Sequence, residues 1–281
     1  RVESYTRKQL IVDRGFQVFL PHYKVSRQFL SLPELELCYY PSGASIATED
    51  GRQWFGHPLN YPKELRVGKK VSASLRDYMQ LGLDVLKGIK HPVGPQEQCI
   101  DHFNQMFSTT FSSTFLKPFF RGVFLDPNFE KSINQYQYYL HCFFRKGAAI
   151  PKRGMQAIPD QLLQQLSKGT IEYDARVTKI EENQLTINNQ TKRFKHICIA
   201  TDFSTAYKLL QLPEPMNPWC SVSNYIFAKK SPTKLAPLTL VASDRLVSHI
   251  NIPTLVSSDL APKGTHYMNV SSFSKASPKE I

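Results

Sequence analysis

Five phenylalanines recur at every fourth position between residues 103 and 119, and this spacing strongly constrains the middle of the chain. They are Phe103, Phe107, Phe111, Phe115 and Phe119. Residues four apart lie on one face of an α-helix, so the spacing predicts a helix carrying a stripe of rings, limited in length by Pro118. Such a stripe forms either part of a hydrophobic core or a wall of a cavity for an apolar substrate. The sequence leaves both interpretations open.

Helical patterns extend to both sides of this stripe. Between residues 71 and 88 the apolar residues fall near helical spacing, and the segment ends at Gly88 with Pro92 beyond it. A glycine after the last periodic residue, followed by a proline, is typical of a helix end. We therefore predict a helix over 71–88, mainly helices from there to about residue 149, and a shorter helix over 22–32.

The remaining segments favour strands. Glycines, prolines and paired asparagines separate short runs of β-branched and aromatic residues, which is typical of strands and hairpins. The predicted strands and hairpins lie at 15–20, 43–56, 170–173, 175–182, 184–194 and 196–201, with three more between 220 and 273. Two helices, over 154–166 and up to residue 210, interrupt this region.

Composition places the chain among folded proteins. It has 281 residues, 41% hydrophobic and 21% charged, which suits about two globular domains. No run of about 18 uncharged apolar residues occurs, so the sequence predicts no membrane span. Five scattered cysteines without a C-x-x-C pair argue against a disulfide framework or a cysteine zinc site. The predicted location is therefore the cytoplasm.

The net charge of +12 favours polyanionic partners, such as nucleic acid or anionic lipid. The basic residues occur only in twos and threes, without the aromatic-interleaved motif of nucleic-acid modules. A generally basic, solvated surface is the favoured interpretation, and we expect no nucleic-acid partner.

Several common catalytic motifs are absent from the sequence. No two of the 13 glycines are two apart, so the dinucleotide fingerprint G-x-G-x-x-G cannot occur. The sequence also contains no P-loop, no H-E-x-x-H helix and no G-x-S-x-G elbow. We therefore predict no metal site and identify no catalytic acid, base or nucleophile.

Three segments nevertheless resemble the flavin-containing amine oxidoreductase superfamily, which includes phytoene desaturases, protoporphyrinogen oxidases and monoamine oxidases, and specifically its bacterial phytoene-desaturase-like members. They are DRGFQVFLPHY at 13–23, FLKPFFRGVFLD at 115–126, and AIPKRGMQAIPDQLLQQL at 149–166 with ARV at 175–177 and ICIATD at 197–202. The second is the most specific. The resemblance spans most of the chain and implies FAD as the cofactor.

The resemblance also implies which residues contact FAD. A glycine-aromatic turn at Gly15, Phe16 and Gln17 would pass close to the flavin ring. The strand residue Val177 would present its main chain to the adenine, and Ala200 and Thr201 would abut the nucleotide.

Two further positions follow from the same resemblance. Gly154 and Met155 match a glycine-rich helix start, although Arg153 stands where relatives carry a second glycine. Arg1 looks like the arginine of the family's GGRxxT motif. Ordinary strand or turn packing is the competing interpretation for Gly154, Val177, Ala200 and Thr201.

The family's opening strand, glycine-rich turn and helix do not occur in the sequence, nor does its closing GD motif. We therefore interpret the chain as a fragment that alone binds flavin weakly or not at all. The predicted fold is α+β or α/β, an incomplete FAD-binding Rossmann-like domain with a substrate domain of mixed sheet and helical cap. Residues 1–20 and 150–210 would form the first, and 21–149 and 211–281 the second, with the cap over about 71–149.

The resulting hypothesis is an FAD-dependent oxidoreductase acting on a small, largely apolar substrate. The expected cavity wall comprises Phe111, Phe115, Tyr136 and Tyr139, facing strands near 222–228. The alternative is a non-enzymatic module that binds lipid or isoprenoid at an anionic membrane surface, in peripheral contact with the bilayer.

Overall fold

A computed structural model describes residues 2–56, 73–88, 97–166, 171–213, 220–230, 234–242, 246–275 and 277. Its contacts divide the chain into two compact units. One comprises Arg1–Leu163 with Cys220–Ile281, and the other comprises Gln164–Trp219. The division does not show which segments bind cofactor or substrate. The assignment of segments to a cofactor domain and a substrate domain therefore stays a prediction.

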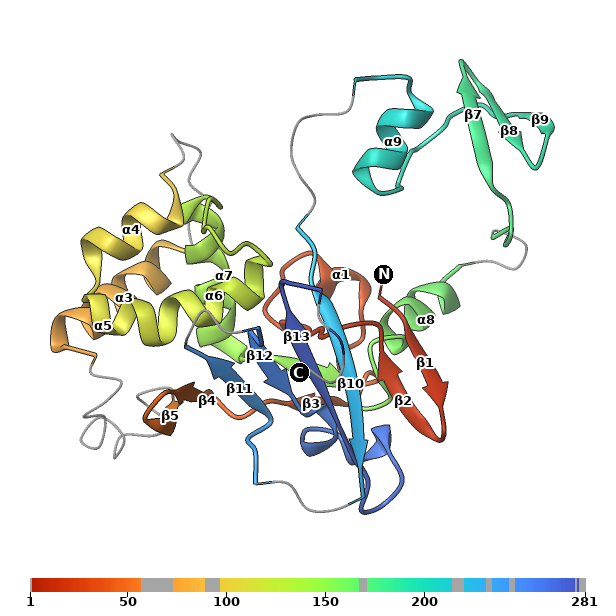
Figure 1. Cartoon of the computed structure of the whole chain (residues 1–281). Coiled ribbons are helices and arrows are strands. Elements are labelled where there is room, and N and C mark those ends of the chain that lie inside the picture. The colour runs from red at the N-terminus through yellow and green to blue at the C-terminus, as the bar shows by residue number, and fades with distance from the viewer. Residues whose placement is uncertain are drawn as a thin grey trace. The chain divides into compact units, whose positions relative to one another are not determined.

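The first unit contains a six-stranded mixed sheet (Figure 1), in agreement with the predicted fold class. Its order is β10 (Ser223–Lys229), β13 (His266–Ser272), β12 (His249–Asn251), β11 (Leu238–Val241), β4 (Gly43–Thr48) and β5 (Gly51–Gly56). Only β11 and β4 pair in parallel. The predicted hairpin over 43–56 is confirmed, with the turn at Glu49 and Asp50.

Two small antiparallel sheets lie in the same unit. They are β1 (Ser4–Arg7) with β2 (Leu10–Asp13), and β3 (Leu37–Tyr39) with β6 (Ala149–Pro151). The strand predicted over 15–20 is absent, because Gly15 turns the chain with a φ of +87° and only Phe19 pairs, with Ala149. The helix predicted over 22–32 is reduced to α1 (Ser26–Phe29).

Helices dominate the described residues between 75 and 146, as predicted, whereas residues 71, 72 and 89–96 lie outside the described residues. They are α3 (Leu75–Lys87), α4 (Cys99–Met106), α5 (Thr109–Phe111), a π-helical turn (Ser112–Leu116), α6 (Lys117–Phe124) and α7 (Ile133–Lys146). A further helix, α8 (Ala157–Gln164), follows β6. Among the described residues, no helix has the length and apolarity needed to cross a bilayer.

The five phenylalanines do not lie on one helix, contrary to the prediction from their spacing. Helix α4 ends at Met106, and the Ser108 side chain accepts a hydrogen bond from Phe111 N, which starts a new helix. The π-helical turn then continues the ring series, with Phe111, Phe115 and Phe119 stacked at centroid distances of 5.5 and 5.6 Å. Because a π-helical turn is wider than an α-helical one, it keeps residues four apart in line.

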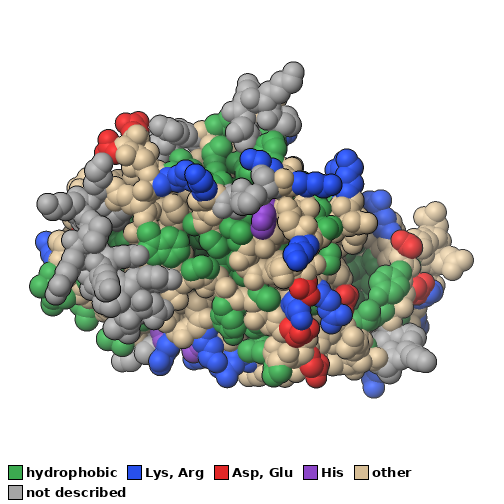
Figure 2. All heavy atoms as spheres, turned by 90° about the horizontal axis from the view of Figure 1, so that it is seen from below, with side chains coloured by type: hydrophobic (Ala, Val, Ile, Leu, Met, Phe, Trp, Pro, Cys, Tyr) green, Lys and Arg blue, Asp and Glu red, His purple; other side chains and the backbone are tan. Residues whose placement is uncertain are grey.

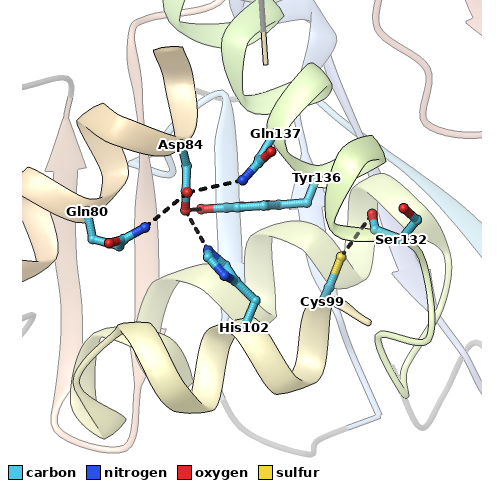
Figure 3. A network of polar contacts seen from close by, with 7 residues as sticks. All are labelled: Gln80, Asp84, Cys99, His102, Ser132, Tyr136 and Gln137. Atoms are coloured by element: carbon cyan, nitrogen blue, oxygen red, sulfur yellow. Dashed lines mark hydrogen bonds and ion pairs between the residues drawn. The ribbon is translucent and has the colours of Figure 1, made fainter. Parts of the chain in front are cut away.

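A buried carboxylate ties three of these helices together (Figure 3). Asp84 of α3 accepts hydrogen bonds from Gln80, from Tyr136 and Gln137 of α7, and from His102 of α4 at 2.7 Å. Each partner thus satisfies part of a charge that would be costly to bury alone. The network fixes the helical block around a core that includes Phe103 and Phe120.

The second unit contains a three-stranded antiparallel sheet of β7 (Val177–Glu181), β8 (Gln184–Ile187) and β9 (Gln190–Arg193), and helix α9 (Phe203–Leu209). The hairpin over 184–194 and the helix up to residue 210 are thereby confirmed. The predicted strands over 170–173 and 196–201 differ: residues 171–173 and 196–201 are not strands, and 167–170 lie outside the described residues. A strand requires a paired neighbour, and no described strand pairs with either segment.

Candidate functional site

A largely apolar cavity of about 1100 Å³ lies in the first unit. Several parts of the chain line it: the segment from Phe16 to Leu20, residues around α1, the segment from Tyr39 to Ala44 with the end of β5, the helical block, strands β11 and β12, and helix α8. Cavities of this size and character commonly hold small organic ligands. Of the late strands, β11 and β12 contribute Leu238, Leu240 and His249 to the lining, whereas none of the expected residues 222–228 lines it.

One wall is the turn predicted to lie near a cofactor ring. Phe16 and Gln17 line the cavity directly after Gly15, whose positive φ brings the chain round from β2. A Cβ at Gly15 would lie 3.3 Å from Asn224 Nδ2, so the turn packs closely on β10. The positive φ therefore favours glycine at this position, and the space beside it is tight.

His249 supplies an unpaired polar atom in the cavity wall. Its side chain is 2% exposed, and its ring lies against Phe16 with centroids 5.0 Å apart. Nε2 has no hydrogen-bond partner among the described residues, and Nδ1 lies 3.4 Å from Ser248 Oγ. Burial lowers the pKa of His249 to about 4, so the imidazole is neutral at physiological pH. Sequence reasoning missed this residue, because no motif singles it out among eight histidines.

Gly154 and Met155 lie together beside β1 and β2. Asp13 accepts a hydrogen bond from Met155 N at 2.9 Å and from Ser4 Oγ at 2.5 Å, and burial, which outweighs these bonds, raises the pKa of its carboxyl. A Cβ at Gly154 would lie 2.7 Å from Ser4 Oγ. Protein packing thus by itself requires a glycine at 154, whereas Met155 also lines the cavity.

The predicted aromatic wall is divided between cavity and core. Phe115 and Tyr139 line the cavity, together with Phe119 of the same ring series. Phe111 and Tyr136 are not among the lining residues, because both are fully buried in the core of the helical block. The stripe of rings is therefore part of the hydrophobic core at Phe111 and part of the cavity wall at Phe115 and Phe119.

The other predicted cofactor contacts lie elsewhere in the chain. Val177 begins β7, and Ala200 and Thr201 precede α9, whose first turn Asp202 caps by accepting from Thr205 N. All three belong to the second unit, and their contact with a cofactor stays a prediction. Arg1 lies outside the described residues. Among the residues that are described, no group of three or more His, Cys, Asp or Glu side chains could hold a metal ion.

Comparison with known proteins decides the family. A family model described as flavin containing amine oxidoreductase matches residues 1–226, which is most of the chain. The chain belongs to this family. Membership places it among flavin-dependent oxidoreductases and confirms the resemblance seen in its sequence. No curated protein matches the chain in sequence.

Solved structures share its fold. A protein from Pyrococcus furiosus aligns with a TM-score of 0.66 and 13% identity, covering 97% of this chain and 70% of its own. An oxidoreductase from Methanosarcina mazei gives 0.66 and 14%, covering 99% and 71%. Cyclohexylamine oxidase from Brevibacterium oxydans gives 0.58 and 12%, covering 96% and 67%. At these identities the likeness concerns the fold alone.

The cavity wall fits the flavin that the family implies. A flavin ring is planar with a polar edge, so it needs both flat apolar contacts and hydrogen-bonding atoms. Phe16 and Met155 offer the apolar contacts, and the amide of Gln17 offers hydrogen-bonding atoms. His249 lies in the same wall, and its buried Nε2 has no partner among the described residues.

Proposed function

We propose that the protein is an FAD-dependent oxidoreductase that acts on a largely apolar substrate in this cavity. The observation that carries the proposal is the convergence of the Gly15–Gln17 turn, the neutral His249 and a wall of stacked rings on one apolar space. When bound, the flavin supplies the capacity to accept or donate a hydride equivalent.

The chain's own residues bind, orient and exclude water. Phe115, Phe119 and Tyr139 present apolar surface to the cavity, which favours a substrate of low polarity. His249 holds its proton on one ring nitrogen and keeps the other as an acceptor, so it can orient a polar edge without introducing charge. No titratable group of the described cavity wall is assigned as a catalytic acid or base.

The proposal is tested by titrating the protein with FAD and following the visible absorption bands and fluorescence of the flavin. We expect saturable binding, because the apolar wall of the cavity can pack on the flavin ring. Phe16→Ala should weaken binding about tenfold, since it removes a ring from the cavity wall. The matched control is Phe194→Ala, which removes a ring directly after β9 in the second unit. It should leave the affinity for FAD unchanged. No saturable binding, or equal effects of both variants, would overturn the cofactor assignment.

A lipid- or isoprenoid-binding module without redox chemistry is the second candidate, favoured by the size and apolar lining of the same cavity. Retinol, a fluorescent polyene, distinguishes the two. If the protein binds retinol but never binds FAD, the binding module is the correct function. If bound FAD is reduced on addition of an apolar electron donor, the protein is an oxidoreductase.

A further inference from the structure

One part of the cavity rim combines cations with exposed apolar side chains. The cations are Lys24, Arg27, Arg145 and Lys146, and the apolar residues are Val25, Phe29, Tyr39 and Leu162; together we call them the rim. Phe29, Tyr39, Leu162, Arg145 and Lys146 all line the cavity. The rim therefore surrounds an entrance to the proposed substrate space.

Three of the apolar rim residues are more than half exposed. Val25 is 68% exposed, Phe29 55% and Tyr39 53%. Val25 and Phe29 are four residues apart across the single turn of α1, so they project on the same side. Clustered large apolar side chains on a surface indicate a site that another apolar body covers.

The cations of the rim converge from two segments. His22 and His141 share a hydrogen bond between their Nε2 atoms at 3.2 Å, which joins the segment before α1 to the last turns of α7. Burial lowers the pKa of His22, and the charges of His141, Arg145, Arg27 and Lys146 lower it further. Three cations from both segments thus act on one imidazole.

These cations lack acidic partners. None of Lys24, Arg27, Arg145 and Lys146 forms an ion pair with another residue that the structure describes. Elsewhere on the surface, Lys152 pairs with Glu36 and Lys192 with Glu172. Figure 2 shows one face of the molecule, on which Lys and Arg side chains form small groups with apolar side chains exposed between them. This agrees with the net charge of +12.

We propose that the rim docks on an anionic lipid bilayer, with Val25 and Phe29 entering the interface and the four cations contacting headgroups. An anionic bilayer complements both halves of the rim, since its headgroup layer carries negative charge and its acyl boundary accepts apolar side chains. Docking in this orientation opens the cavity toward the membrane, so an apolar ligand enters from lipid without crossing water. The inference concerns a surface and holds whether or not the cavity hosts redox chemistry.

Co-sedimentation with vesicles tests the location of this surface. Wild-type protein should bind phosphatidylcholine vesicles containing phosphatidylglycerol, and should bind pure phosphatidylcholine much more weakly. The pair Arg27→Gln with Lys146→Gln should lower binding roughly twentyfold, because each cation near an anionic bilayer contributes about fivefold. The matched pair Arg52→Gln with Lys229→Gln removes the same charge from exposed positions on β5 and β10, and should change binding little. Equal losses in both pairs, or no vesicle binding at all, would overturn the proposal.

Insertion of the apolar residues has its own readout. Phe29→Trp, measured against wild-type protein with its two native tryptophans, should gain fluorescence that brominated lipids in anionic vesicles quench. Val25→Ser, at a rim position outside the cavity lining, should weaken vesicle binding several-fold while leaving binding of FAD in solution unchanged. A Phe29→Trp signal that brominated lipids do not quench would show that α1 remains outside the bilayer.

Discussion

The imidazole of His249 lies almost fully out of water, so its protonation is coupled to folding. Its pKa is about 4 in the folded protein, because burial disfavours the charged form, against 6.5 for an ordinary histidine. Between these values the unfolded chain binds a proton that the folded chain does not. The contribution of His249 to the free energy of unfolding therefore falls as pH decreases from 6.5 toward 4, and is constant above that window.

His249→Phe should remove this pH dependence. At about pH 5 the wild-type residue costs about 2 kcal/mol of stability relative to neutral pH, whereas a phenylalanine has nothing to titrate. Urea unfolding of both proteins at about pH 7 and about pH 5 measures the difference. Asp13, whose pKa burial raises, titrates in both proteins and so cancels from the comparison.

The control is His196→Phe, at an exposed position in the second unit. This variant should keep the wild-type dependence of stability on pH. If His249→Phe also keeps it, the imidazole is not held neutral by burial, and its proposed role as an uncharged hydrogen-bonding group in the cavity wall is wrong.

At the scale of elements, Asp84 connects α3, α4 and α7 through the network of Figure 3. Asp84→Asn replaces an acceptor of four hydrogen bonds by a group that must itself donate two. We expect the free energy of unfolding to fall by about 3 kcal/mol, measured by urea denaturation. Asp101→Asn, at an exposed position on α4, should cost only about 0.5 kcal/mol. A similar loss in both variants would mean that the network does not hold the helices together.

Local patterns predicted those elements that depend on local interactions. The hairpin over 43–56 and helix α3 are examples, since a short turn and a run of apolar residues ending at Gly88 are both visible in neighbouring residues. The prediction of a strand over 196–201 was wrong, because a strand needs a paired neighbour and hydrophobic periodicity cannot identify one. The prediction that the five phenylalanines share one helix was also wrong. Ser108 caps a new helix after α4, and a single serine is a weak signal in the sequence.

The candidate site, too, was predictable only in part from the sequence. The resemblance predicts flavin contacts at Phe16, Gln17 and Met155, and the expected cavity wall includes Phe115 and Tyr139. All five line one cavity, and their contact with a cofactor or substrate stays a prediction. The resemblance did not identify His249, because a single histidine on a short strand produces no pattern. Nor could spacing separate Phe111 from Phe115, since which turn of the helical region faces the cavity depends on the packing of other helices.

At the scale of the whole molecule, the residues predicted to contact the cofactor are divided between the two units. The cavity wall of the first unit suits a ring, whereas Val177, Ala200 and Thr201 of the second unit are predicted to contact the nucleotide. A flavin without adenosine tests these contributions separately, because riboflavin retains the ring and lacks the nucleotide.

Ala200→Leu should therefore weaken FAD binding about tenfold and leave riboflavin binding unchanged. Its added bulk would obstruct only an adenine-side contact, and Ala200 is exposed in the structure, so the larger side chain does not disturb a core. Fluorescence titration with each flavin measures both affinities, and Ala175→Leu serves as a control on the segment before β7. If Ala200→Leu weakens both flavins equally, residue 200 acts on the fold or on the ring. If it weakens neither, the second unit does not contact the nucleotide at this position, and the affinity for FAD arises from the first unit.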